Sequence, residues 1–126
     1  MSESILVLDP SGVIRRLLSE IIRECGYRSL FSVDGEDALA KLGNKEHSIR
    51  LVFLEWHLPG ITGLDFLIKL KSLGEHMDLP VVFVTTESNR DSVVTALQNG
   101  ASDYITKPFS IEQIKHKIKY FVQNEI

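Results

Sequence analysis

Runs of apolar, often β-branched residues alternate along the chain with longer segments in which apolar residues recur at helical spacing. The apolar runs occupy residues 4–9, 27–33, 50–55, 80–86 and 101–106. The segments with helical spacing occupy residues 11–26, 34–43, 63–74, 88–100 and 110–123. Strand and helix patterns follow one another in regular order, which predicts five strands and five helices.

Residue types that favour helix ends agree with this division. Glycines follow four of the predicted helices, at Gly26, Gly43, Gly74 and Gly100. Pairs with the spacing of N-terminal caps begin three of the five predicted helical segments: Asp34 with Asp37, Ser88 with Asp91, and Ser110 with Gln113. The chain also lacks repeats and low-complexity linkers, so residues 1–126 are expected to form one domain.

The central apolar runs indicate how the strands are arranged. LVFL at 51–54 and VVFV at 81–84 are apolar on both faces, which is typical of strands covered by helices on each side. Single helices between strands favour right-handed parallel crossovers. The prediction is a doubly wound α/β sandwich of three layers, whose five-stranded parallel sheet has the flavodoxin-like order 2-1-3-4-5.

Composition narrows the possible functions. With 126 residues, 44% hydrophobic and 25% charged, the chain suits one globular domain with a core. The sequence has no apolar run long enough to span a bilayer and begins without the pattern of a secretory signal, so we expect a cytoplasmic protein without a membrane partner. A formal net charge of −3 argues against nucleic acid as the main partner.

Polar residues follow the strands that border the expected ligand crevice. In the predicted fold this crevice lies at the carboxyl ends of strands 1 and 3, where the winding reverses. The first strand ends in Asp9 and the third in Glu55, while Thr85 ends the fourth and Lys107 follows the fifth. We therefore expect two carboxylates, a hydroxyl and an ammonium group to meet at one edge of the sheet.

Four stretches of sequence carry a resemblance to a known family: VLDPS, LVFLEWHLPGITG, VVFVTTE and GASDYITKPF. Over residues 5–122 the chain resembles the receiver domains of bacterial two-component response regulators, in particular the stand-alone chemotaxis (CheY-like) type. In such domains a histidine kinase donates a phosphoryl group to an aspartate after the third strand, and Mg²⁺ is bound there. The resemblance matches Thr85 and Lys107 to the residues that hold the phosphoryl oxygens, Tyr104 to the switch aromatic, and Asp9 to one metal ligand.

Two departures from the family pattern affect the expected chemistry. Glu55 stands where the family has its phosphoacceptor aspartate, and Pro10 stands where it has a second acid. One extra methylene displaces the acceptor oxygen by roughly 1.5 Å, which can cost ~10²-fold in the rate of in-line transfer. Mg²⁺ would retain only Asp9, Glu55 and, by resemblance, the backbone carbonyl of His57, so its binding is expected to be weak.

The resulting prediction is an atypical receiver that is not an enzyme, binds proteins, and has lost much or all of its conventional phosphorylation. Glu55 would then be a partial mimic of the phosphorylated state or an inert replacement. We expect Glu55 to pair only with Lys107, so that Thr85 gains no new acceptor and Tyr104 lies outward or in two rotamers. The resemblance also predicts a cis Lys107–Pro108 peptide and a partner surface formed by the fourth helix, fifth strand and fifth helix.

Two alternatives stay open. In one, the pocket still takes Mg²⁺ and a phosphoryl group, and the chain is a working chemotaxis-type regulator with a histidine kinase as partner. In the other, the chain is a small flavin-binding or hydrolytic enzyme. DPSGV has a single glycine and Trp56 is a single aromatic, so flavin binding has weak support. His57 lacks a second histidine at metal spacing, which favours a solvated loop residue over a transition-metal ligand.

Overall fold

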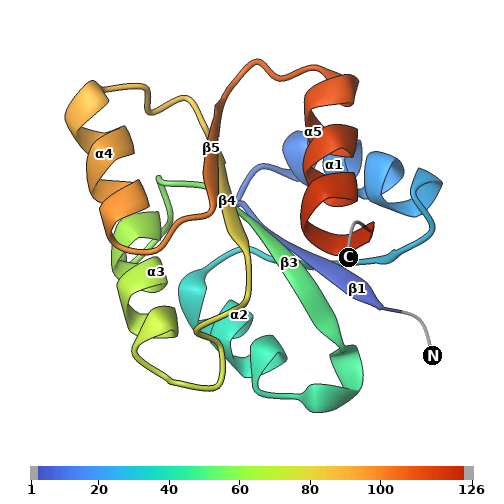
Figure 1. Ribbon diagram of the computed structural model, residues 1–126, viewed down its shortest axis with the longest axis horizontal. Coiled ribbons are helices and arrows are strands. Elements are labelled where there is room, and N and C mark those ends of the chain that lie inside the picture. Colours follow the sequence, from blue (N-terminus) through green and yellow to red (C-terminus); the bar gives the residue numbers. More distant parts are fainter. Residues whose placement is uncertain (1–2, 124–126) are drawn as a thin grey trace.

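The computed structural model describes residues 3–123 and contains the expected alternation of strands and helices (Figure 1). The strands are β1 (Ser4–Leu8), β2 (Arg28–Ser32), β3 (Ile49–Leu54), β4 (Val81–Thr85) and β5 (Asp103–Thr106). The helices are α1 (Gly12–Glu24), α2 (Gly35–Leu42), α3 (Gly63–Lys71), α4 (Arg90–Gln98) and α5 (Ile111–Ile118). A 3-10 turn, η1 (Lys45–His47), precedes β3, and a π-helical turn, η2 (Lys119–Gln123), continues α5.

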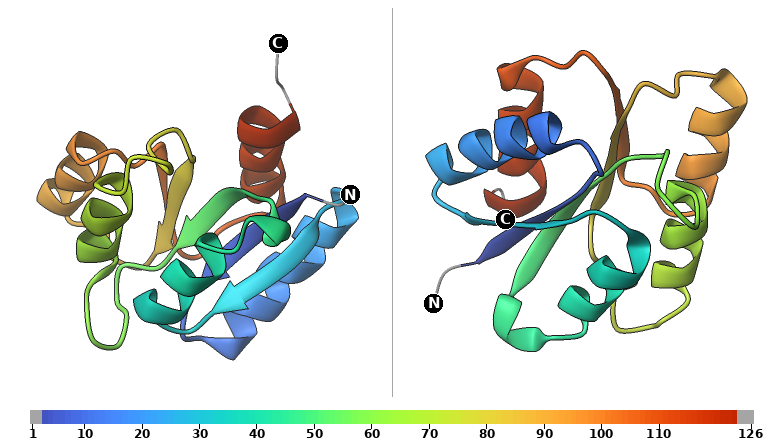
Figure 2. Two further views of the ribbon diagram at one scale, coloured as in Figure 1. Left: turned by 90° about the horizontal axis from the view of Figure 1, so that it is seen from below. Right: turned by 180° about the vertical axis from the view of Figure 1, so that it is seen from behind.

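The sheet is fully parallel and has the order β2-β1-β3-β4-β5. This confirms the predicted doubly wound arrangement, in which the winding reverses between β1 and β3. Helices α1 and α5 cover one face of the sheet, and α2, α3 and α4 cover the other (Figure 2). The carboxyl ends of β1, β3, β4 and β5 therefore come to the same edge.

The core has two halves because successive strand residues point to opposite faces. In β1, Ile5 and Val7 pack with α1 and α5, while Leu6 and Leu8 pack with α2 and α3. All four side chains are fully buried, as expected for a strand that helices cover on both faces. Each such side chain contributes about 1.5–3 kcal/mol when it leaves water. None of the helices in residues 3–123 is long and apolar enough to cross a membrane.

Two of the three predicted helix caps are present. Asp34 accepts a hydrogen bond from the Asp37 backbone N–H at 2.8 Å, and Ser110 forms a capping box with Gln113. The prediction that Ser88 caps the fourth helix is wrong. Asn89 caps α4 instead, because its side-chain oxygen accepts from the Asp91 N–H at 2.8 Å. The Asn89 side chain thus bonds the N–H group two residues further on, in an Asx turn, whereas Ser88 was expected to bond the N–H group three residues further on.

Gly63 begins α3 and ties this helix to the end of β3. Its N–H donates to the Trp56 carbonyl at 2.7 Å. A Cβ atom at this position would lie 2.3 Å from the Glu55 carbonyl oxygen and 2.9 Å from the Trp56 Cα atom. Both are backbone atoms, so a side chain here would push apart the loop that carries Glu55.

We expect Gly63→Ala to destabilise the fold by about 1–3 kcal/mol, the usual cost of overpacking, because the strand end and the helix start must separate. Urea unfolding followed by circular dichroism measures this change. Gly43→Ala is the matched control, since a Cβ there would meet its nearest atoms at an ordinary 3.5 Å. Equal stability for Gly63→Ala and Gly43→Ala would contradict the close approach.

Candidate functional site

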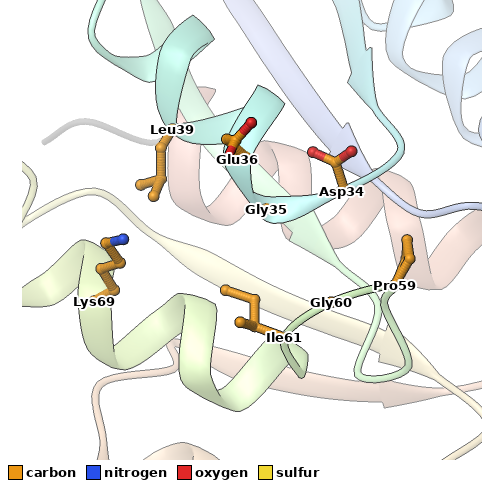
Figure 3. Close-up of a pocket in the computed structure, with 8 residues that line it drawn as sticks. All are labelled: Asp34, Gly35, Glu36, Leu39, Pro59, Gly60, Ile61 and Lys69. Atoms are coloured by element: carbon orange, nitrogen blue, oxygen red, sulfur yellow. The ribbon is translucent and has the colours of Figure 1, made fainter.

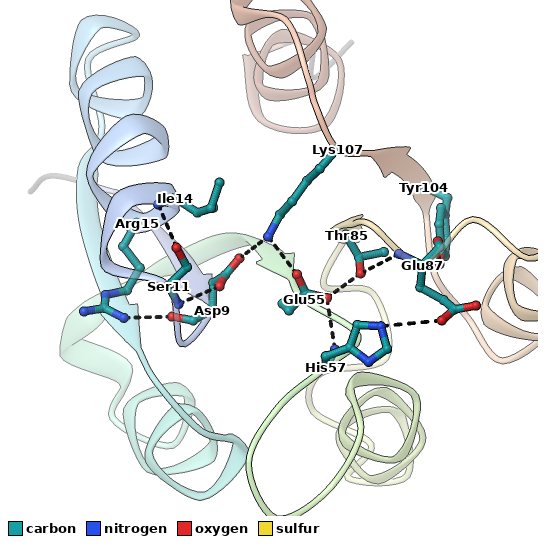
Figure 4. A network of polar contacts seen from close by, with 10 residues as sticks. All are labelled: Asp9, Ser11, Ile14, Arg15, Glu55, His57, Thr85, Glu87, Tyr104 and Lys107. Atoms are coloured by element: carbon teal, nitrogen blue, oxygen red, sulfur yellow. Dashed lines mark hydrogen bonds and ion pairs between the residues drawn. The ribbon is translucent and has the colours of Figure 1, made fainter.

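The four polar residues that were predicted to converge lie together at the carboxyl edge of the sheet (Figure 4). Asp9 follows β1 and Glu55 follows β3 directly, and their exposed fractions are only 3% and 6%. Thr85 is the last residue of β4 and is fully buried. Lys107 comes after β5, and its peptide bond to Pro108 is cis, as predicted.

The ammonium group of Lys107 bridges the two carboxylates. Its Nζ donates to Asp9 Oδ2 at 2.9 Å and to Glu55 Oε1 at 2.7 Å. Burial by itself lowers the pKa of Lys107, but the hydrogen bonds and charges of Glu55 and Asp9 outweigh it and hold that pKa above its ordinary value. The lysine is therefore a fixed cation in this pocket.

Asp9 is held from its other side by the start of α1. Its Oδ1 accepts from the Ser11 N–H at 2.8 Å, and the Arg15 guanidinium donates to its backbone carbonyl at 3.0 Å. Pro10 lies exposed between these contacts and adds no acceptor side chain. Asp9 is thus the acidic residue that the loop after β1 contributes to the pocket.

The second carboxylate oxygen of Glu55 also has its own donors. Oε2 accepts from the Thr85 hydroxyl and from the His57 N–H, the latter at 3.0 Å. Our expectation that Glu55 pairs only with Lys107 is therefore wrong. The two oxygens point in different directions, so Oε1 meets Lys107 while Oε2 remains available to Thr85.

The charge state of Glu55 follows from these contacts. Burial raises its pKa, but hydrogen bonds from Lys107, Thr85 and the His57 backbone outweigh burial and lower the pKa below its ordinary value of 4.5. A carboxylate that accepts several hydrogen bonds is favoured in its charged form. Glu55 is therefore an anion at neutral pH.

Tyr104 is connected to Thr85 through Glu87. The Glu87 N–H donates to Thr85 Oγ1 at 3.1 Å, and the Glu87 carbonyl accepts from the Tyr104 hydroxyl at 2.6 Å. The Tyr104 ring stacks on Phe83 with centroids 5.3 Å apart. We expected Tyr104 to lie outward or in two rotamers. In the structure it does not lie outward, because its ring is half-buried and packs against the core.

The environment of Tyr104 also changes its acidity. Burial, followed by the nearby charges of Glu87 and Glu55, raises the pKa of Tyr104 to about 12. The hydroxyl is thus a donor at neutral pH, as its contact with the Glu87 carbonyl requires. Glu87 ends the stretch VVFVTTE, but the sequence gave no signal for its role, because that role depends on backbone atoms.

His57 and Trp56 lie beside the pocket and do not enter it. The His57 ring is 61% exposed and its Nε2 lies 3.5 Å from Glu87 Oε1, away from the two carboxylates (Figure 4). Trp56 packs on Phe83 with ring centroids 5.5 Å apart. The His57 side chain therefore contributes to the Glu87 region and not to an Asp9–Glu55 metal site.

The donor set fits Mg²⁺ poorly. A hard cation of this kind requires near-octahedral oxygen ligands, usually with waters. Here the carboxylate oxygens of Asp9 and Glu55 accept from Lys107, Thr85 and backbone N–H groups. Throughout residues 3–123, no group of three or more His, Cys, Asp or Glu side chains is arranged to hold a metal. A cation that binds both carboxylates would lie close to the Lys107 ammonium group and would share these oxygens with it.

Comparisons with known proteins identify the family of the chain. The family model for the response regulator receiver domain matches residues 5–119. The chain is 35% identical over 118 residues to the chemotaxis protein CheY of Pseudomonas aeruginosa, covering 91% of this chain and 92% of that protein. It is 30% identical over 116 residues to chemotaxis protein CheY1 of Helicobacter pylori, covering 91% and 93%.

Solved structures give the same result. The receiver domain of NtrX from Brucella abortus superposes with a TM-score of 0.84 at 32% identity, covering 96% of this chain and 99% of that one. A CheY-like receiver domain protein from Methanospirillum hungatei superposes with a TM-score of 0.86 at 26% identity, covering 95% and 93%. These matches are with signalling domains and not with flavin-binding or hydrolytic proteins.

The lowered pKa of Glu55 predicts a specific dependence of stability on pH. Its contribution is fully present above the ordinary pKa of 4.5 and is lost as pH falls through the lower pKa of the folded state. Glu55→Gln should therefore flatten the acid side of the stability profile, measured by urea unfolding at a series of pH values. Glu46→Gln, at an exposed position, is the control. A profile for Glu55→Gln as steep as that of the unmodified protein would contradict the prediction.

Proposed function

The chain belongs to the family of response regulator receiver domains of two-component signalling, and we propose that it is an atypical receiver that binds proteins without conventional aspartate phosphorylation. The observation that carries this proposal is the position of Glu55. It directly follows β3, where the resemblance places the phosphoacceptor, and both of its oxygens already have donors. In this proposal the chain is not an enzyme.

The same contacts support Glu55 as a partial mimic of a phosphoryl group. A phosphoryl group would place negative charge between Lys107 and Thr85, and the Glu55 carboxylate occupies that position with a hydrogen bond from each. A ligand or charge shifts a conformational equilibrium only by its different interactions with the two states. The Thr85 contact is such an interaction, because it would be absent if Thr85 had turned away.

Tyr104 provides the link from this anion to the surface. Its half-buried position depends on the Glu87 carbonyl, and the Glu87 N–H is in turn held by Thr85. We propose that this inward arrangement is the resting state of the protein. The receiver would then present one fixed form of the surface around Tyr104 instead of switching between two.

We further propose that partners bind the surface formed by α4, β5 and α5. A cavity of about 460 Å³ lies there, lined by Leu97, Ser102, Asp103, His116, Lys117, Tyr120 and Phe121. Leu97 and Tyr120 are 46% and 58% exposed, which leaves apolar area for a protein contact. A histidine kinase remains a candidate partner, while the net charge of −3 gives no support to nucleic acid.

Because Thr85 and Lys107 are both present, one alternative stays open: a receiver that still binds Mg²⁺ and accepts a phosphoryl group. Incubation with acetyl phosphate and Mg²⁺ separates the two functions, because mass spectrometry detects an added phosphoryl group directly. We expect no stoichiometric acyl phosphate, since the extra methylene displaces the Glu55 oxygens from the position of an aspartate acceptor and these oxygens already accept hydrogen bonds. We also expect Mg²⁺ to quench Trp56 fluorescence only at millimolar concentration, roughly the weakest range of protein metal sites.

Restoring variants provide the positive control for that experiment. Glu55→Asp alone should recover little, because Pro10 still leaves the metal one carboxylate short. The double variant Glu55→Asp, Pro10→Asp should recover more phosphorylation and tighter Mg²⁺ binding. A phosphoryl group on Glu55 in the unmodified protein, or quenching that saturates at micromolar Mg²⁺, would favour the phosphorylation-competent alternative.

The link from Thr85 to Tyr104 makes a separate prediction. Thr85→Val keeps the shape but removes the donor to Glu55 and the acceptor for the Glu87 N–H, so Tyr104 should become more exposed. The ¹⁹F resonance of 3-fluorotyrosine at Tyr104, assigned with Tyr104→Phe, should move toward the solvent-exposed position. Thr86→Val, at the neighbouring exposed residue, should leave it in place. An unchanged resonance in Thr85→Val would show that Tyr104 is held independently of Glu55.

A further inference from the structure

A second cavity lies between α2 and α3, beside the loop that follows β3 (Figure 3). Its volume is about 490 Å³, within the range of small-molecule sites. The lining residues are Asp34, Gly35, Glu36, Leu39, Pro59, Gly60, Ile61 and Lys69. The cavity is therefore near the carboxyl ends of β2 and β3, the edge at which doubly wound folds bind ligands.

Apolar groups form much of the lining. Leu39 of α2 and Pro59 and Ile61 of the loop after β3 all border the cavity, and Ile61 is 38% exposed overall. A Cβ atom on Gly35 would lie 3.1 Å from Ile61 Cδ1, so Ile61 packs directly on the start of α2. This contact holds one wall in place while the space above it stays open to a ligand.

The charged groups around this lining have no ionic partners within residues 3–123. Asp34 uses one oxygen, Oδ1, to cap α2. Asp34, Glu36 and Lys69 form no ion pair with any described residue. Figure 3 shows the two carboxylates on the α2 side of the cavity and Lys69 on α3 at its other end. The net charge of the lining is therefore negative, with one cation and two anions.

We propose that this cavity binds a small organic cation that carries an apolar group, such as an alkyl guanidinium or alkyl ammonium compound. The apolar group would lie on Leu39, Pro59 and Ile61. The cationic end would lie between Asp34 and Glu36, where two carboxylates with free oxygens can accept its hydrogen bonds. Lys69 at the far end disfavours a second positive charge, so the ligand carries its cation at one end only.

The charge balance of the lining selects this class over its alternatives. An alkyl carboxylate would meet two like charges and one opposite charge, and an alkyl alcohol would gain no ionic contact. A bare guanidinium ion would leave the apolar lining in contact with water and would lose the hydrophobic contribution. Both parts of the ligand are therefore required for binding.

The test is an NMR titration of the full chain with n-hexylguanidinium, followed through backbone amide shifts. We expect saturable shifts at Gly35, Gly60 and Ile61, with weaker binding of guanidinium ion, hexanoate and 1-hexanol. Asp34→Asn retains the helix cap, since asparagine caps as well as aspartate does, and Glu36→Gln retains the shape. Each should weaken binding of n-hexylguanidinium about two- to fivefold, the range for a partly exposed ionic contact.

Two further variants separate a local site from the general charge of the surface. Lys69→Gln should tighten binding, because it removes a like charge from the cavity. Asp65→Asn removes an acid from the first turn of α3 without changing the lining, so it should leave binding unchanged. Shifts that do not saturate, equal binding of hexanoate or 1-hexanol, or equal weakening by Asp65→Asn would overturn the proposal.

Discussion

One ammonium group between two buried carboxylates organises the carboxyl edge of this sheet. Taking charges out of water is costly unless they are paired and hydrogen-bonded. Lys107 compensates for only one of the negative charges of Asp9 and Glu55. The remaining charge is stabilised by donors that the local backbone and one hydroxyl supply. The loops after β1 and β3 and the end of β4 must therefore keep their positions for the site to persist.

This requirement explains why the arrangement extends to Tyr104. Thr85 donates to the Glu55 carboxylate, which fixes its hydroxyl as the acceptor for the Glu87 N–H. With the Glu87 backbone held, its carbonyl lies within hydrogen-bonding distance of the Tyr104 hydroxyl. The aromatic rings of Trp56, Phe83 and Tyr104 pack in succession alongside this polar path. A buried anion is thus connected to a side chain on the proposed partner surface through a short series of contacts.

The sequence predicted the part of this site that depends on topology. Asp9 and Glu55 directly follow strands of a parallel sheet and Thr85 ends one, so the strand order alone brings them to one edge. The sequence did not predict the hydrogen bond from Thr85 to Glu55, because the direction of each carboxylate oxygen depends on side-chain conformation within the packed site. Glu87 was missed for a related reason: its backbone groups connect Thr85 to Tyr104, and backbone groups leave no mark in a sequence. The Asn89 cap was missed because adjacent Ser88 and Asn89 both suit a helix start.

The choice of glutamate over aspartate now has a physical interpretation. In the proposed function, the extra methylene moves the carboxylate farther from the strand and out of the alignment that in-line phosphoryl transfer requires. The same extension lets one carboxylate meet the Lys107 ammonium and the Thr85 hydroxyl at once. In the proposed function, the substitution that removes the transient anion therefore supplies a permanent one, and Thr85 and Tyr104 keep an anion to respond to.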